Sequence, residues 1–260
     1  AGCLGEDSKG LQFSFSKEEQ SAIGIFLKER DGSLGRHSPS EFANRQFKEL
    51  RCVACHERDG KESLWGAFSR EVSSLKGKGG DIPDALSNPE QVYAASRTPP
   101  DLSFAGEKLK ENWLAAFLMG KEAEKPRPWM KARMPSFSIR ANAFALGLSS
   151  SCGVFSAMKD EPNHHNEKQL EQVGGKIVNT LCITCHGVGK QKPTAVFEGQ
   201  GLNLILSRSR MRYDHYMRWM MNPYRIIPNT IMPRFADEEG RTGLIDLLEG
   251  DAHRQFGSVW

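Results

Sequence analysis

Two short stretches decide the fold of this chain, CVACH at residues 52–56 and CITCH at residues 182–186. In each stretch two residues separate a pair of cysteines, and a histidine follows directly. One helical turn between the thiols spaces them to match the vinyl groups of a porphyrin, and it aims the imidazole at the iron. The pattern therefore predicts two covalently bound haem c groups, one at each motif.

Two other kinds of site share the CxxC spacing. A zinc site would need both cysteine pairs to share one ion and would not require the trailing histidines. A thioredoxin-like redox pair would follow a strand, whereas the residues before both motifs have the pattern of helices. The sequence favours haem attachment over both.

An internal repeat surrounds the two motifs. Residues 101–117 align with residues 203–219 without a gap, so that Leu109 corresponds to Met211. Each copy follows a CxxCH motif and precedes a Met-Pro pair. Two copies of so complex an order indicate a duplication.

The repeat also selects the distal iron ligands. Among nine methionines, Met134 and Met232 occupy the same place in both halves, and each precedes a proline that fixes a loop around the sulfur. A thioether ligand suits electron transfer because it favours ferrous iron. We therefore predict the following site residues: Cys52, Cys55, His56 and Met134 at the first haem, and Cys182, Cys185, His186 and Met232 at the second, with the histidines and methionines on the metal.

The repeat predicts domain 1 at residues 31–155 and domain 2 at residues 156–260, after a leading helical segment at residues 1–30. The leading segment is either the end of a preceding domain, which would make the chain part of a larger polypeptide, or an extra helix on domain 1. Residues 237–249 are expected to form the last helix, and residues 141–160 the tail of domain 1 and a linker.

The two halves differ in length at one place. The histidine of the first motif lies 46 positions before Leu102, and that of the second 18 positions before Leu204, so domain 1 holds 28 extra residues, roughly 65–96. We expect this insertion to decorate the surface.

Several residues outside the motifs leave alternatives open. Cys3 and Cys152 are compatible with one disulfide in an oxidising compartment, although Cys3 also resembles the end of a lipoprotein cleavage box. His215 aligns with Trp113, and it is either an edge contact or propionate partner of the second haem or a surface histidine. Five arginines near the second ligand loop either steer an acidic partner or form a solvated helix face, the interpretation we favour: Arg208, Arg210, Arg212, Arg218 and Arg225.

Composition excludes two classes of protein. The net charge is +3 and forms no concentrated basic stripe, so nucleic acid is not an expected partner. No apolar stretch reaches the roughly 18 residues that a membrane span requires. No signal peptide is visible, so an exported protein would be represented here by a mature or excised chain.

From residue 38 to residue 250 the chain resembles class I cytochrome c domains. Such domains place a helix before CxxCH, a Pro- or Asn-Leu loop near the histidine, and a Met-Pro loop before the last helix. PDL at 100–102 and LNL at 202–204 match the first loop, and RMP at 133–135 and IMP at 231–233 match the second. The tandem order is also similar to cytochrome modules in large multidomain cytochromes of planctomycete-type bacteria.

The resemblance implies an all-α fold of two tandem class I cytochrome c domains, each wrapping one haem. It also implies an electron carrier rather than an enzyme, which exchanges single electrons with other redox proteins and is extracytoplasmic, either in the bacterial periplasm or exported. Two alternatives stay open: a haem-bearing subunit or domain of a larger oxidoreductase, and a dihaem peroxidase. A peroxidase would need one iron without its distal ligand.

Overall fold

The computed structural model describes residues 15–34, 38–75, 99–122, 124–128, 133–154, 168–195, 200–228 and 230–260. Within these ranges the regular structure is helical, and the only extended pairing consists of isolated bridges. The all-α prediction is confirmed. No helix in the same ranges is long and apolar enough to cross a membrane.

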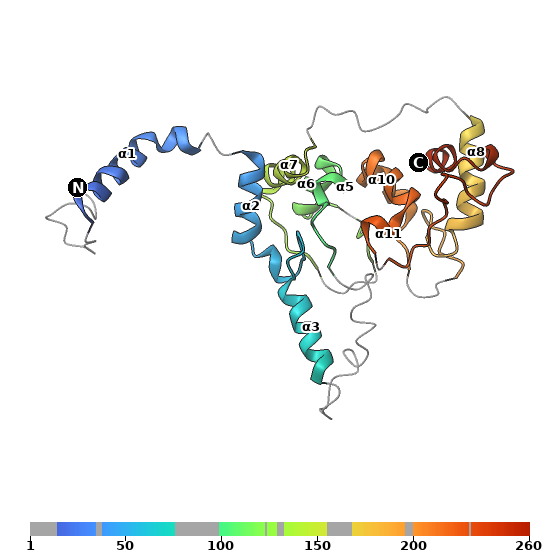
Figure 1. The fold of residues 1–260 in the computed structure, drawn as a ribbon, viewed down its shortest axis with the longest axis horizontal. Helices are drawn as coiled ribbons and strands as arrows, with labels where there is room; N and C mark the ends of the chain where they lie inside the picture. The colour runs from blue at the N-terminus through green and yellow to red at the C-terminus, as the bar shows by residue number, and fades with distance from the viewer. Residues whose placement is uncertain are drawn as a thin grey trace.

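The helices form two groups that follow one another along the chain (Figure 1). Before the first group, α1 spans Lys17–Leu34. The first group comprises α2 (Pro39–Glu49), η1 (Cys52–Ala54), α3 (Leu64–Leu75), α5 (Ala105–Lys108), α6 (Glu111–Leu118) and α7 (Ala141–Ser151). The second comprises α8 (Lys168–Ile177), η4 (Val178–Cys182), η5 (Leu204–Leu206), α9 (Ser207–Arg210), α10 (Tyr213–Met221), α11 (Pro223–Ile226), η6 (Leu248–Gly250) and α12 (Ala252–Val259).

The core of the first group lies between α2, α6 and α7. Helix α2 begins at Pro39 because the Ser38 side chain accepts a hydrogen bond from the Glu41 amide and proline suits the first helical position. Phe47 from α2 and Phe144 from α7 are buried in the same cluster. The two helices approach closely at Gly147, where an added Cβ would lie 2.1 Å from the Pro39 carbonyl oxygen.

The second group repeats this helix pair with α8 and α12. Here the glycine at the close contact lies on the first helix of the pair, α8, and not on the second. A Cβ on Gly174 of α8 would lie 2.0 Å from the Ser258 carbonyl oxygen of α12. Helix α10 closes the core, and Tyr216 donates a buried hydrogen bond of 2.7 Å to the Phe256 carbonyl. In each half, therefore, a pair of packed helices (α2 with α7, α8 with α12) has a third helix (α6 or α10) packed against it.

Two predictions of secondary structure from the sequence are wrong, one near the end of each half. Residues 141–151, expected to belong to a tail and linker, form α7, which is central to the first core. Residues 237–249, expected to form the last helix, consist of turns, bridges and the start of the short η6. Helix α12 begins only after Asp251, whose side chain accepts from the Arg254 amide. The leucines of 237–249 have helical spacing, but positive φ angles at Leu248 and Glu249 turn the chain instead.

Two helices extend away from the body of the molecule (Figure 1). A capping box begins α1: the Ser16 amide donates to the Glu19 side chain, and the Glu19 amide donates to the Ser16 side chain. Phe26 of α1 is 61% exposed. Helix α3 occupies the start of the predicted insertion and leaves Trp65 and Phe68 exposed, which agrees with surface decoration; residues 76–98 lie outside the described ranges.

The two helical groups meet at equivalent segments of the repeat, residues 108–110 and 210–212. The Lys110 amide donates to the Arg210 carbonyl (2.8 Å), and the Arg212 amide donates to the Lys108 carbonyl (3.0 Å). Leu109 and Met211 form an antiparallel bridge between these two bonds. Because each bond maps onto the other when the repeats are exchanged, the contact has approximate twofold symmetry. We call this contact, residues 108–110 with 210–212, the seam.

Candidate functional site

The two CxxCH motifs adopt the same turn. In the first, the Cys52 carbonyl accepts from the amides of Cys55 (3.2 Å) and His56 (2.9 Å). In the second, the Cys182 carbonyl accepts from the amides of Cys185 and His186 at the same two distances. Helix α2 leads into the first turn through Arg51 in the left-handed conformation, whereas η4, a π-helical turn, leads into the second. The segments before the two motifs therefore differ, but the CxxCH turns that follow them have the same geometry.

Each motif histidine is held by a backbone carbonyl of the loop that the repeat places next to it. His56 Nδ1 lies 2.8 Å from the Pro100 oxygen, and His186 Nδ1 lies 2.7 Å from the Leu202 oxygen. A carbonyl oxygen can only accept, so Nδ1 carries the hydrogen and Nε2 keeps its lone pair. A histidine oriented in this way is prepared to ligate a metal through Nε2.

The loops close on the imidazoles in matching ways. The Leu102 amide donates to the Glu57 carbonyl, and the Leu204 amide donates to the Gly187 carbonyl, one residue after each histidine. In the second half, Gly201 lies so close to the His186 ring that a Cβ would come within 2.5 Å of it. The ring orientation is therefore set by backbone packing as well as by the hydrogen bond.

The motif cysteines are free thiols. Burial raises the pKa of Cys182 to about 11 and also raises the pKa of Cys52. A redox-active CxxC pair needs the opposite shift, because the thiolate is the reactive form. In the described part of the chain no group of three or more His, Cys, Asp and Glu side chains could hold a metal ion, as zinc would require.

The two predicted distal ligands have different surroundings. Met232 is half-buried against the second core, and its sulfur accepts a hydrogen bond from Trp219 Nε1 at 2.9 Å. Met134 is 37% exposed. The repeat places Phe117 where the second half has Trp219, so the first half has no indole donor at this position.

The loop that follows Met134 is nevertheless fixed to α6. Ser136 donates to the Met119 carbonyl (2.7 Å), and the Phe137 amide donates to the Leu118 carbonyl (2.7 Å). These bonds hold the backbone immediately after the predicted ligand while its side chain stays accessible. The structure thus offers one exposed and one half-buried methionine.

Of the five arginines near the second ligand loop, two are buried at the seam. Arg210 and Arg212 are each 6% exposed, so the favoured prediction of a solvated helix face is wrong for them. Arg212 donates through Nε to the Leu109 carbonyl (3.1 Å), which ties the second half to the first. Arg218 forms an ion pair with Glu107.

His215 is not a surface histidine, since it is 2% exposed. Its Nδ1 lies 3.7 Å from Glu107 Oε1, and neither ring nitrogen has a hydrogen-bond partner. Burial lowers its pKa to about 3, and the charge of Lys108 contributes. A neutral imidazole, that of His215, therefore lies beside the seam, close to several cations.

The sequence did not lead us to expect a role for Lys108 in the seam or for Glu107 next to it. A signal was present in the repeat itself, because the order basic, apolar, basic occurs both at residues 108–110 and at residues 210–212. Two copies of an uncommon order at the same repeat position indicate a shared role.

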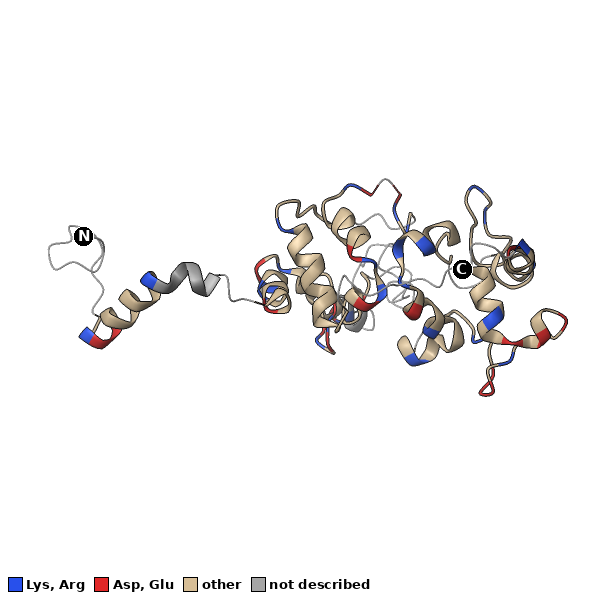
Figure 2. Ribbon diagram, turned by 90° about the horizontal axis from the view of Figure 1, so that it is seen from above, with Lys and Arg blue, Asp and Glu red and all other residues tan. Residues whose placement is uncertain are grey.

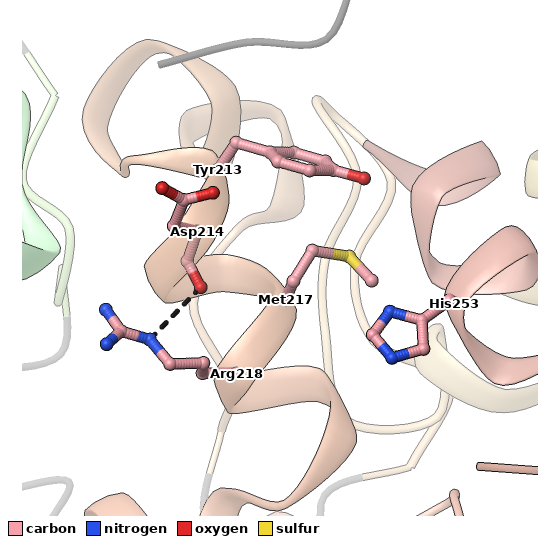
Figure 3. Close-up of a pocket in the computed structure, with 5 residues that line it drawn as sticks. All are labelled: Tyr213, Asp214, Met217, Arg218 and His253. Carbon is pink, nitrogen blue, oxygen red and sulfur yellow. Dashed lines mark hydrogen bonds between the residues drawn. The ribbon is translucent and has the colours of Figure 1, made fainter. Parts of the chain in front are cut away.

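A hollow of about 470 Å³ lies elsewhere in the second half. Figure 3 shows its lining, with the Arg218 side chain bonded to the Asp214 carbonyl and His253 opposite Met217. None of its lining residues belongs to a CxxCH motif or a Met-Pro loop, so we do not include it in the candidate site.

The remaining predictions concern residues that are only partly described. Cys152 is a free thiol whose sulfur lies 3.9 Å from the Ser103 carbonyl. Cys3, the other cysteine of the disulfide with which the sequence is compatible, lies outside the described residues. The chain matches no protein-family model, no curated protein and no solved structure.

Proposed function

We propose that this chain is an extracytoplasmic dihaem c-type cytochrome that passes single electrons between other redox proteins. The observation that carries the proposal is the pair of motif histidines, each with Nδ1 held by a carbonyl at the same repeat position. One such arrangement could serve packing alone. Two, each at the end of a CxxCH turn, are best explained by a metal ligand at Nε2.

The residues present fit a haem. Cys52 and Cys55, and Cys182 and Cys185, would hold the porphyrin through thioether bonds, while His56 and His186 would ligate the iron. Met134 and Met232 would be the sixth ligands. Haem supplies an iron that changes between the ferric and ferrous states; the protein anchors it, orients the ligating imidazoles and sets its exposure to water.

A dihaem peroxidase is the second candidate, and the exposure of Met134 favours it. A peroxidase needs one iron from which the distal ligand is absent or easily displaced. The exposed Met134 meets that requirement better than Met232, which is half-buried and accepts a hydrogen bond from Trp219. Membership in a larger oxidoreductase keeps the same haem chemistry and would be detected by co-purification with a catalytic subunit.

The decisive experiment is to produce the full chain, exported, in a bacterium that attaches haem to CxxCH motifs. Intact mass and a pyridine haemochrome assay should show two haems per chain. Replacing Cys52 and Cys55 by serine should leave one haem, and Cys152→Ser, the control outside the motifs, should leave two. A chain that emerges without covalent haem would refute the proposal.

The same preparation tests the distal ligands. The oxidised protein should show the weak far-red charge-transfer band of methionine-ligated ferric haem, and the band should weaken in Met134→Ala and again in Met232→Ala. If the wild-type protein contains two haems but no such band, the methionine assignment is wrong and the haem assignment stands. Added peroxide, turned over after half-reduction, would support the peroxidase alternative.

A further inference from the structure

Two cations cross the seam in opposite directions. Lys108 ends α5 in the first half, and its Nζ lies 6.0 Å from the centre of the Trp219 ring in the second half. Arg210 ends α9 in the second half, and its Cζ lies 5.8 Å from the centre of the Trp113 ring in the first. Lys108 and Arg210 are equivalent in the repeat. Each half thus extends one cation over an aromatic side chain of the other.

These two cations have no anionic partner among the residues that the structure describes. Arg210 is 6% exposed, and its Nε is buried without a hydrogen-bond partner. Glu107 immediately precedes Lys108 in the sequence, but its carboxylate forms an ion pair with Arg218. Uncompensated buried charge is costly, and proteins satisfy it with a partner of opposite sign.

The charges also act on one another. Burial, together with the charges of Arg210 and Arg127, lowers the pKa of Lys108 to about 8. Burial and the Arg127 charge lower the pKa of Arg210 to about 10. The cation cluster reaches Trp219, whose indole donates to the Met232 sulfur.

A haem c carries two propionate carboxylates, and charge-assisted hydrogen bonds from guanidinium and ammonium groups are the strong way to bind them. We infer that Lys108 and Arg210 form a carboxylate-binding site at the seam that holds haem propionates, each cation serving the haem of the opposite half. This inference rests on the haem assignment proposed above. It makes the seam an electrostatic link between the two haems.

The test uses the full-length protein with both haems and follows their two midpoint potentials by spectroelectrochemistry. Removing a positive charge beside a haem makes the added electron less stable, so the potential falls. Arg210→Gln should lower the reduction equilibrium constant of the first haem about tenfold, or about 59 mV for one electron. Lys108→Gln should act mainly on the second haem.

The two potentials are assigned with Met134→His. Exchanging the thioether for an imidazole lowers the potential of the first haem alone, because methionine ligation is what raises it. If Arg210→Gln then lowers mainly the potential of the second haem, the crossed arrangement is wrong. Arg208→Gln, the same change at an exposed arginine of the same helix, should move neither potential by more than about twofold in equilibrium constant.

Resonance Raman spectra supply a readout that is specific to the propionates. Their bending bands should shift in Arg210→Gln and stay unchanged in Arg208→Gln. Should Arg210→Gln fail to fold, Arg210→Lys keeps the charge but loses the planar fork, so the bands should shift while the potentials stay close to wild type.

Haem content separates the two possible failures. A wild-type chain without haem overturns the proposed function and this inference together. If two haems remain in the variants and neither the potentials nor the propionate bands move, the seam site is refuted and the proposed function survives.

Discussion

The two halves of the molecule share a scaffold and differ around the predicted distal ligand. Both have the same CxxCH turn and the same hydrogen bond between the motif histidine and a backbone carbonyl. Both also have a pair of packed helices, α2 with α7 and α8 with α12. In the second half, however, Met232 is half-buried and accepts from Trp219, whereas Met134 is exposed and has a phenylalanine at the corresponding place. The proximal side is duplicated and the distal side has diverged.

This difference indicates where the two predicted iron sites would acquire different properties. The proximal side is built from backbone hydrogen bonds, which depend little on side-chain identity. The distal side depends on single side chains, so one substitution changes access or hydrogen bonding. We therefore expect the two sites to differ in ligand exchange and potential. Among the described residues, acidic and basic side chains are interspersed over both halves (Figure 2).

The largest expected effect concerns the shared helix pair. A Cβ at Gly174 would lie 2.0 Å from a backbone oxygen of α12, so Gly174→Ala forces α8 and α12 apart. We expect a loss of about 3 kcal/mol in the free energy of unfolding, the upper part of the range for overpacking. Denaturant unfolding of the purified protein measures it.

The neighbouring glycine is the control. Nothing lies within 4 Å of a Cβ at Gly175, so Gly175→Ala should leave stability unchanged or raise it by up to about 1 kcal/mol through helix propensity. Equal destabilisation by both substitutions would show that the close contact between α8 and α12 does not hold the second half together.

The next effect should distinguish the two predicted iron sites. Because Met134 is exposed, whereas Met232 is half-buried and hydrogen-bonded to Trp219, azide or imidazole should replace the first methionine about tenfold more readily, a difference of about 1.4 kcal/mol. Titration of the oxidised protein should give two binding phases. In Met134→Ala only the tighter phase should change; a change confined to the weaker phase would show that the half-buried site, not the exposed one, exchanges its ligand more readily.

The sequence was sufficient for the parts of the fold that repeat. The two motifs form matching turns, and the aligned residues 101–117 and 203–219 occupy equivalent places in the two halves. These are local features, in which a few neighbouring residues determine the backbone. The identity of the bound group and the iron ligands remain predictions.

The sequence failed where tertiary contacts decide. Helix α7 contains no charged residue because it is covered by α2, α5 and α6, so it lacks the polar face by which a helix is recognised. The burial of Arg210 and His215 depends on contacts across the seam, which connect residues about a hundred positions apart. No local pattern distinguishes such an arginine from a solvated one.

A smaller effect is expected from a hydrogen bond that only the second half has. Tyr216 donates to the Phe256 carbonyl, and Leu114 occupies the corresponding place in the first half. Tyr216→Phe removes this buried bond and should cost about 1 kcal/mol in the free energy of unfolding. Leu114→Met, a volume-conserving control in the first core, should cost less than about 1.5 kcal/mol without changing the haem spectrum. A Tyr216→Phe protein as stable as wild type would show that the hydrogen bond contributes nothing net.

The smallest effect should come from making the second distal site resemble the first. Trp219→Phe removes the donor to the Met232 sulfur and keeps an aromatic ring. Without that donor the sulfur gives more electron density to the iron, which favours the ferric state, so the potential of the second haem should fall. We expect a change of about threefold in the reduction equilibrium constant, or about 30 mV. Phe117→Tyr is the matched change in the first half, and its effect should be confined to the first haem. If Trp219→Phe leaves both potentials unchanged, the hydrogen bond to Met232 does not persist in the haem-bound protein, and the divergence between the two distal sides lies in their exposure alone.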